Sequence, residues 1–255
     1  MTNEYLEFIE NTLMPAANDV IRQYYDAYKK GDDIDVQTKA DQSPASAADR
    51  EAEKALRALI NKTYPDHGIW GEEFVGENLE AEFVWILDPL DGTKQFLSKQ
   101  DHCFVILIGL FQNKKPLAGG ASDPLSEKVW LGSTSVLESS NNKVASTAPD
   151  EMFRDHKYKS GLNELIKDAD ITTSLNAKSF LSVLDGDVSV GIESRLSLHD
   201  IAALIPIIDR AGAIATDFEG NLYSQKEFEF NNDKYDLLVT AHQKKTNEVL
   251  NIIQQ

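Results

Sequence analysis

The first thirty residues carry apolar side chains at spacings of three, four and seven positions, which is the stripe of an amphipathic helix. Pro15 falls inside this stripe, so the helix is predicted to kink or to divide in two at that point. The polar stretch from Gly31 to Pro44 is expected to form a loop or a short pair of strands. Ser46 then stands where an N-cap residue would begin a second helix. The apolar positions of the two helices are Leu6, Ile9, Leu13, Val20 and Tyr24, followed by Ala52, Leu56, Leu59 and Ile60.

After Pro65 the apolar residues gather in short runs that are typical of buried strands. The run 83–87 ends abruptly in the sequence Asp88-Pro89-Leu90-Asp91-Gly92-Thr93. A turn is predicted at Asp123-Pro124. The other strands expected in this part of the chain are 103–111, 116–122 and 128–132.

The chain becomes polar from Leu137 to Asp150, which indicates a domain boundary. We therefore expect an N-terminal α+β domain of residues 1–145 and a C-terminal α/β domain of residues 146–255. In the second domain helical and strand patterns alternate, which predicts helices packed against a sheet. The helices are expected near 161–168, 176–184 and 200–210 and at the C-terminus, and the strands near 170–174, 188–192, 213–216 and 235–241.

The composition is that of a packed, soluble globule, with 42% hydrophobic and 26% charged residues among 255. No apolar run approaches the roughly 18–20 residues of a membrane span. The N-terminus carries acids where a signal peptide would carry bases, so a cytoplasmic enzyme is expected. Cys103 is the single cysteine, which excludes an intrachain disulfide and a zinc site built from thiolates. Its apolar surroundings predict an inert thiol inside a strand.

The formal net charge is −17, from 25 Lys and Arg against 42 Asp and Glu. Such a surface repels nucleic acid and anionic membranes, so neither is expected as a partner. It would also repel a small phosphate ester, unless a cation stood between the carboxylates and the substrate. Most of the acids serve ordinary solubility.

The motif after the strand 83–87 offers a place for such a cation. A buried strand delivers Asp88 and Asp91 at its C-terminal end, where mixed α/β proteins often bind ligands. A tight turn could let both carboxylates and a backbone carbonyl face one point, and these hard oxygen donors suit Mg²⁺. Gly92 and Thr93 then begin a short helical pattern, whose free N–H groups would favour a phosphate.

A plain surface turn is the alternative, because Asp-Pro and Asp-Gly are common turn formers. Two other acidic sites make the turn less satisfactory as the whole explanation. Glu72 and Glu73 precede the motif by a short interval, and Asp200 begins an apolar helix near the C-terminus. At that position an aspartate can equally be explained as a helix cap.

The three acidic sites together resemble the signature of the inositol monophosphatase-like, Mg²⁺-dependent phosphatases. In that family an acid–acid pair precedes Asp-Pro-Ile/Leu-Asp-Gly-Thr, and a later Asp heads a helix. The resemblance runs roughly from Asp41 to Gly220. It implies the layered αβαβα sandwich of the sugar phosphatase fold, hydrolysis of a phosphate monoester, two or three Mg²⁺ ions and a homodimer. Most metal ligands would lie in the N-terminal domain, and Asp200 would come from the C-terminal domain with part of the substrate pocket.

The resemblance also implies roles for single residues. One metal would be bound by Glu72, Asp88 and the Leu90 carbonyl, and a second by Asp88, Asp91 and Asp200. A third ion would be bound more weakly, with Glu72 as a ligand. Glu72 therefore counts among the catalytic residues with Asp49 and Thr93. Asp49 and Thr93 would orient the attacking water, the Gly92 and Thr93 amides would hold phosphate oxygens, and Glu193 would contact the organic part of the substrate.

The sequence departs from the family pattern at two places. His199 stands where the family usually has Trp, and it is expected to pack or to support a ligand. The segment Ser174-Leu175-Asn176-Ala177-Lys178 replaces a Gly-Ser type of sequence. Both departures leave the metal ligands intact and put the substrate pocket in doubt. Asp185 and Asp187 are expected in a turn.

The chemistry implied by the resemblance is in-line attack by water, with metals polarising the phosphoryl oxygens and stabilising the leaving alkoxide. The sequence around Asp88 looks more like the histidinol-phosphatase and nucleotide-phosphatase branches than the inositol branch, and the sequence after Asp200 looks most like histidinol-phosphatases. The substrates in order of expectation are therefore histidinol phosphate, inositol monophosphate and 3′-phosphoadenosine 5′-phosphate. Two other classes stay open. One is an inactive metal-binding regulator of transcription or ribosome assembly, and the other is a Ca²⁺-binding protein, for which no twelve-residue EF-hand loop is present.

Overall fold

The apolar stripe at the N-terminus forms a helical rod in three segments, in a computed structural model of the chain. They are α1 (Thr2–Phe8), the π-helical turn η1 (Ile9–Leu13) and α2 (Met14–Lys30). Pro15 is the second residue of α2, and Met14 separates it from the π turn. Because the wider π turn does not use the missing N–H of Pro15, the rod continues with a change of helix type. The predicted division thus falls just before Pro15, as a change of helix type at Met14 and not as a break in the helix. The structure describes residues 2–38, 44–126, 128–132, 136–137, 143–146, 156–167, 170–172 and 176–255.

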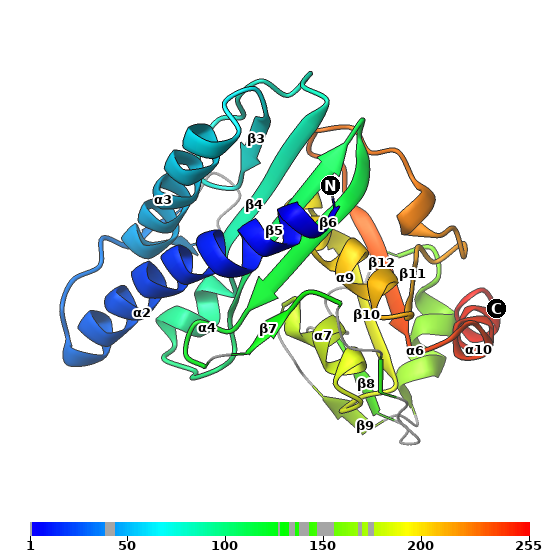
Figure 1. The fold of residues 1–255 in the computed structure, drawn as a ribbon. Helices are drawn as coiled ribbons and strands as arrows, with labels where there is room; N and C mark the ends of the chain where they lie inside the picture. Colours follow the sequence, from blue (N-terminus) through cyan, green and yellow to red (C-terminus); the bar gives the residue numbers. More distant parts are fainter. Residues whose placement is uncertain are drawn as a thin grey trace.

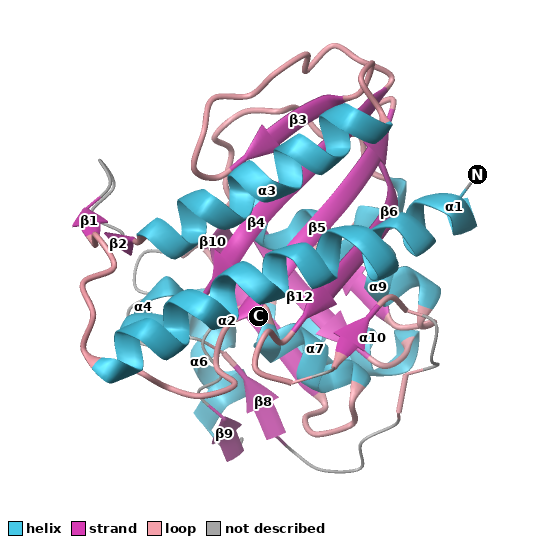
Figure 2. Ribbon diagram, turned by 60° about the vertical axis from the view of Figure 1, so that its left-hand side comes forward, coloured by secondary structure: helices cyan, strands magenta, loops and turns pink. Residues whose placement is uncertain are grey.

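A second long helix, α3 (Ala47–Thr63), begins at Ser46 as predicted. The Ser46 hydroxyl accepts a hydrogen bond from the Ala48 N–H at 3.2 Å, which satisfies one of the exposed amides of the first turn. The polar stretch before it contains a short antiparallel pair, β1 (Gln37–Thr38) and β2 (Pro44–Ala45). The rod and α3 lie side by side over one face of a sheet (Figures 1 and 2).

That first sheet has five strands in the order β3-β4-β5-β6-β7. Strands β3 and β4 are parallel, and the remaining neighbours are antiparallel. Strand β4 is longer than predicted, because it continues through the Asp-Pro-Leu-Asp sequence, with a shift of register between Asp88 and Asp91. The strands are β3 (Gly68–Gly71), β4 (Phe83–Asp91), β5 (Val105–Gln112), β6 (Lys115–Ser122) and β7 (Val129–Trp130).

The second sheet also has five strands, in the order β11-β12-β10-β8-β9. Strand β10 is antiparallel to β12 and parallel to β8, so it lies at the change of direction within the sheet. The strands are β8 (Lys143–Ala145), β9 (Asp170–Thr172), β10 (Val190–Leu196), β11 (Ile214–Thr216) and β12 (Tyr235–Thr240).

The helices of the second half divide between the two faces of that sheet (Figure 1). Helices α7 (Lys178–Leu184), α8 (Leu198–Ala202) and α9 (Leu204–Arg210) pack between the sheets, while α6 (Lys159–Lys167) and α10 (Gln243–Ile253) cover the outer face. The short elements α4 (Thr93–Leu97) and η2 (Tyr223–Gln225) complete the set. The order of layers is therefore helix, sheet, helix, sheet, helix, and the expected αβαβα sandwich is confirmed.

Two expectations need correction in detail. The helix expected over 200–210 begins earlier and divides at Ala203 into α8 and α9, because Pro206 has no N–H to bond the carbonyl four residues before it. Cys103 precedes β5 instead of lying inside a strand, and it is only partly buried.

The apolar core is continuous across the two halves of the chain. One cluster between the sheets contains Leu107 of β5 together with Leu204 of α9 and Val239 of β12. The first strand of the second sheet, β8, ends at Ala145 and so lies just before the expected domain boundary at 145/146, and most of the polar stretch 137–150 lies outside the described residues. The division into two domains stays a prediction. Among the residues described, no helix combines the length and apolar character needed to cross a bilayer.

Candidate active site

The sandwich brings three of the predicted acids together although they are far apart in sequence. Asp88 and Asp91 lie at the end of β4, and Asp200 lies on α8, which packs against β4 and β5. One carboxylate oxygen from each of the three lies within 4.8 Å of the other two. Hard oxygen donors at such spacing fit a divalent cation such as Mg²⁺.

Burial, together with the neighbouring charges, raises the pKa of each of the three carboxyls above its ordinary value. For Asp88, burial is the main cause, followed by the charges of Glu72, Asp91 and Asp200. Burial also leads for Asp91 and for Asp200, with the neighbouring acids adding to it. Buried carboxylates that repel one another without a cation are the electrostatic condition in which a cation binds well.

Glu72 lies beside this group and was predicted to bind the same metals. It follows β3, and its N–H donates to the Leu87 carbonyl at 3.1 Å, which places it next to the end of β4. Its side chain shares a hydrogen bond with Asp88, which contributes to the raised pKa of Asp88. Glu72 therefore borders the three aspartates on the side of β3.

Two of the predicted acids are held in the same way by a serine three residues earlier. The Ser46 N–H and hydroxyl donate to Asp49 Oδ2 at 2.8 and 2.6 Å, and those of Ser197 donate to Asp200 Oδ2 at 2.6 and 2.7 Å. Each pair is a capping box that begins a helix. Asp200 is thus both a cap and a member of the acidic cluster, so the two explanations open at the sequence level hold together.

The second oxygen of Asp49 reaches the motif on β4. Thr93 Oγ lies 3.0 Å from Asp49 Oδ1 and 3.2 Å from the Leu90 carbonyl, so its single proton can serve either acceptor. Asp49 is 1% exposed, and its burial raises the pKa of its carboxyl against the lowering effect of the bonds from Ser46 and Thr93. The predicted pairing of Asp49 with Thr93 is therefore present as a direct contact.

Gly92 connects β4 to α4 with a φ of 100°, a conformation that favours glycine. A Cβ at this position would overlap the Asn176 side-chain amide and would lie 3.1 Å from the Cys103 carbonyl. The glycine of the motif thus permits a close approach of the segment before α7.

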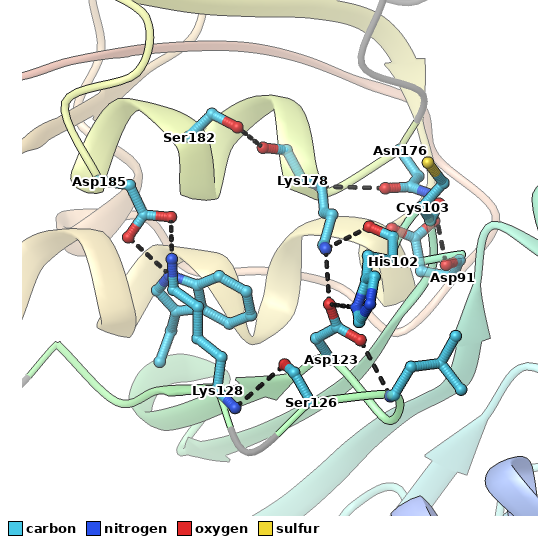
Figure 3. Close-up of polar contacts among 12 residues, drawn as sticks. Asp91, His102, Cys103, Asp123, Ser126, Lys128, Asn176, Lys178, Ser182 and Asp185 are labelled. Carbon is cyan, nitrogen blue, oxygen red and sulfur yellow. Dashed lines mark hydrogen bonds and ion pairs between the residues drawn. The ribbon is translucent and has the colours of Figure 1, made fainter. Parts of the chain in front are cut away.

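Sequence reasoning missed how that segment supports the site (Figure 3). The Ala177 N–H donates to Asp91 Oδ2 at 2.6 Å, and the Asn176 side chain donates to the Cys103 carbonyl at 2.7 Å. In the sequence these positions indicate only the start of a helix near 176 and a departure from the family pattern. Ser174 and Leu175 lie outside the described residues.

A buried ion pair on α3 was also missed. Glu53 is fully buried, accepts from Arg57 Nε at 2.8 Å and accepts from the Glu73 N–H at 2.8 Å. Arg57 in turn reaches the Phe74 carbonyl at 3.2 Å and Glu77 at 2.8 Å. The pair therefore fastens the loop that carries Glu72 to the helix that carries Asp49, and the i, i+4 spacing of Glu and Arg was the available signal.

The remaining predicted residues lie on the second half. Glu193 is 2% exposed on β10, the strand that leads into α8. His199 packs against the ring of Trp70 with centroids 4.4 Å apart, so it joins the element before Glu72 to the helix of Asp200. Asp185 follows α7 and pairs with Lys128 at 2.6 Å.

The chain thus combines an αβαβα sandwich with a cluster of buried carboxylates where β4 meets α8, and known proteins share this fold. Solved structures share the fold along nearly the whole chain. The extragenic suppressor protein suhB from Bartonella henselae has a TM-score of 0.78 at 21% identity, covering 97% of this chain and 98% of its own. An inositol monophosphatase from Anabaena has a TM-score of 0.76 at 21% identity, covering 100% of this chain and 97% of its own.

The family model of the inositol monophosphatase family matches residues 2–255, and the chain belongs to this family. It is 30% identical to the chloroplastic bifunctional phosphatase IMPL2 of Arabidopsis thaliana over 84% of this chain, and it spans 65% of that protein's length. It is 28% identical to the histidinol-phosphatase of Mycobacterium tuberculosis, over 74% of this chain and 79% of that one. The family expected from the sequence is confirmed, and it is a family of phosphatases.

Proposed function

We propose that the chain is a Mg²⁺-dependent phosphatase that hydrolyses a small phosphate monoester. The observation that carries the proposal is the meeting of Asp88, Asp91 and Asp200 within 4.8 Å, beside the contact between Asp49 and Thr93. The first group can hold a divalent cation, and the second can hold a water molecule. Both are needed for hydrolysis without a covalent intermediate.

Asp88, Asp91 and Asp200, with Glu72 and the Leu90 carbonyl, would hold two or three Mg²⁺ ions. Bound Mg²⁺ supplies Lewis-acid polarisation of the phosphoryl oxygens and neutralises charge on the leaving oxygen. Asp49 fixes the Thr93 hydroxyl through its 3.0 Å contact, so that Thr93 can orient the attacking water and Asp49 can accept its proton. The N–H groups of Gly92 and Thr93 would bind phosphate oxygens.

Histidinol phosphate is our first candidate substrate. Its support is the likeness to histidinol-phosphatases, among them the one from Mycobacterium tuberculosis, and the buried carboxylate of Glu193, which suits a cationic organic group. Inositol monophosphate and 3′-phosphoadenosine 5′-phosphate are the next candidates. We further propose a homodimer, on the family resemblance.

A release assay for inorganic phosphate, run over these three esters with Mg²⁺, tests the activity. Asp200→Asn serves as the inactive control because it removes one carboxylate of the cluster. Turnover of histidinol phosphate well above the other two esters is the expected result. If the folded wild-type protein binds Mg²⁺ but hydrolyses none of the three esters, the enzymatic proposal is refuted.

A regulatory role is the second candidate. It is favoured by 30% identity to the Nus factor SuhB of Xylella fastidiosa, over 69% of this chain and 70% of that one. The Asp49–Thr93 contact favours the phosphatase, in which it would serve the attacking water. The release assay therefore separates the two candidates.

A further inference from the structure

Three consecutive residues that lead into α7 donate hydrogen bonds to the two ends of the segment 91–103 (Figure 3). Asn176 donates to the Cys103 carbonyl, Ala177 donates to the Asp91 carboxylate, and Lys178 Nζ donates to the His102 carbonyl. The contacts fall at both ends of the stretch 91–103, which contains α4. The start of α7 is therefore attached to the site from the other half of the chain.

The fit between the two segments leaves little space. The Asn176 amide occupies the position where a side chain on Gly92 would begin. Asn176 itself has a φ of 87°, an unusual value for a residue with a side chain. A small displacement of α7 would therefore move the N–H of Ala177 away from Asp91.

One buried ion pair fixes this end of the helix. Lys178 Nζ lies 2.9 Å from Asp123 Oδ2, and the two side chains are 19% and 4% exposed. Asp123 follows β6 and is itself held, because its other oxygen accepts from the Leu125 N–H at 3.0 Å and Oδ2 also contacts His102 Nδ1 at 3.0 Å. The lysine thus ties α7 both to a rigid turn and to the carbonyl beside Cys103.

We propose that Lys178, through its pair with Asp123, is a positioning residue that sets the orientation of the Asp91 carboxylate. The pair holds the start of α7 so that the Ala177 N–H fixes one oxygen of Asp91 at 2.6 Å. One oxygen of the same carboxylate belongs to the cluster with Asp88 and Asp200. This role rests on the proposed function, in which Asp91 holds a metal ion.

The opposite end of α7 offers a matched control. Lys128 pairs with Asp185, the residue that ends the helix, at 2.6 Å, and these side chains are 48% and 25% exposed (Figure 3). This pair also joins the β6–β7 region to α7, but it makes none of the contacts to Asp91 or Cys103. Loss of Lys128 should loosen the helix without moving Asp91.

The test compares Lys178→Met/Asp123→Asn with Lys128→Met. The double variant removes both charges, because deleting only the lysine would leave a buried carboxylate without compensation. Isothermal titration calorimetry gives the Kd for Mg²⁺, and thermal melting in EDTA reports the fold without metal. Neither readout depends on activity.

For the double variant we expect a Kd for Mg²⁺ about 10–100-fold higher, the usual effect of losing a residue that orients a ligand, and a melting temperature in EDTA close to wild type. The single variant Lys178→Arg should keep most of the wild-type affinity for Mg²⁺, because its charge can still pair with Asp123. The control Lys128→Met should keep the wild-type Kd. Should the double variant fail to fold, Asp123→Asn alone tests the same pair, because it removes the charge opposite Lys178 and leaves the lysine its bond to the His102 carbonyl.

A wild-type Kd in the variant, or an equal rise in Lys128→Met, would overturn the positioning role. A wild-type protein that binds no Mg²⁺ would instead overturn the proposed function, and the role of Lys178 with it. The Kd of the variants thus tests the positioning role, and Mg²⁺ binding by the wild type tests the proposed function.

Discussion

Replacing Asp91 by Asn should make the metal-free protein more stable, even though it removes a proposed ligand. The carboxylates of Asp88, Asp91 and Asp200 lie within 4.8 Å of one another, and the pKa of each is raised. Two full charges about 5 Å apart repel by about 3 kcal/mol at an effective dielectric constant near 20. The wild type avoids part of this repulsion by keeping a carboxyl protonated. Keeping that proton costs about 1.4 kcal/mol for each unit by which the pKa of the carboxyl lies below the working pH.

The net gain expected for Asp91→Asn in EDTA at pH 7.5 is therefore about 1–3 kcal/mol, or about 3–10 °C in melting temperature for a chain of this size. The asparagine oxygen can still accept from the Ala177 N–H, so that contact need not be lost. A raised pKa means that the repulsion is absent at low pH and develops as the pH rises through the raised values. The advantage of the variant should accordingly shrink towards pH 4 and widen towards pH 8.

Differential scanning calorimetry of both proteins in EDTA, and again with excess Mg²⁺, measures these effects. Mg²⁺ should raise the melting temperature of the wild type strongly and that of the variant little, which reverses their order. Asp26→Asn, an exposed acid on α2, is the control and should shift stability by no more than about 0.5 kcal/mol. A variant that melts below the wild type in EDTA at pH 7.5 would refute the electrostatic account of the cluster.

Three further outcomes are expected. Thr93→Ala should lower kcat about 10²–10⁴-fold with little change in the Kd for Mg²⁺, as calorimetry and steady-state kinetics would show, and a collapse of metal affinity would contradict the role of orienting water. Phosphate release should stop in EDTA, return with Mg²⁺ and be inhibited by Ca²⁺, whose looser geometry misplaces the water, and undiminished turnover in EDTA would exclude the metal. Glu193→Gln should reduce kcat/KM about 10–100-fold for histidinol phosphate but hardly at all for an aryl phosphate, because it removes a charge-assisted contact to a cationic group. A loss shared by both substrates would assign Glu193 to the metals or the fold instead.

Local patterns predicted those parts of the fold that depend on neighbours in sequence. Pro15 indicated the place where the first helix changes type, Ser46 indicated the start of α3, and the apolar run 83–87 indicated the strand that ends in the acidic motif. The π-helical form of residues 9–13 was not predictable, since no spacing rule separates a π turn from an α turn. The continuation of β4 through Pro89 was not predicted either, because it depends on pairing with β5, which is distant in sequence.

The site shows the same limit. Its acids could be named because each stands in a short motif, and the Ser-x-x-Asp pattern before Asp49 and Asp200 would also have predicted how they are held. The approach of Asn176 and Lys178 to the segment 91–103 has no local signal, because it depends on how α7 packs against the end of β4. Contacts of this kind are fixed only by the assembled sandwich.

The shared core between the sheets has a consequence for synthesis on the ribosome. Leu107 and Ile86 of the first sheet are covered by residues of α8 and α9, which include the helix that carries Asp200. At about 5–20 residues per second, translation reaches Asp200 roughly 5–20 seconds after Asp91. During that interval the nascent chain has an uncovered apolar sheet face and an incomplete set of acids. The arrival of one helical segment then buries the face and completes the acid cluster in the same event.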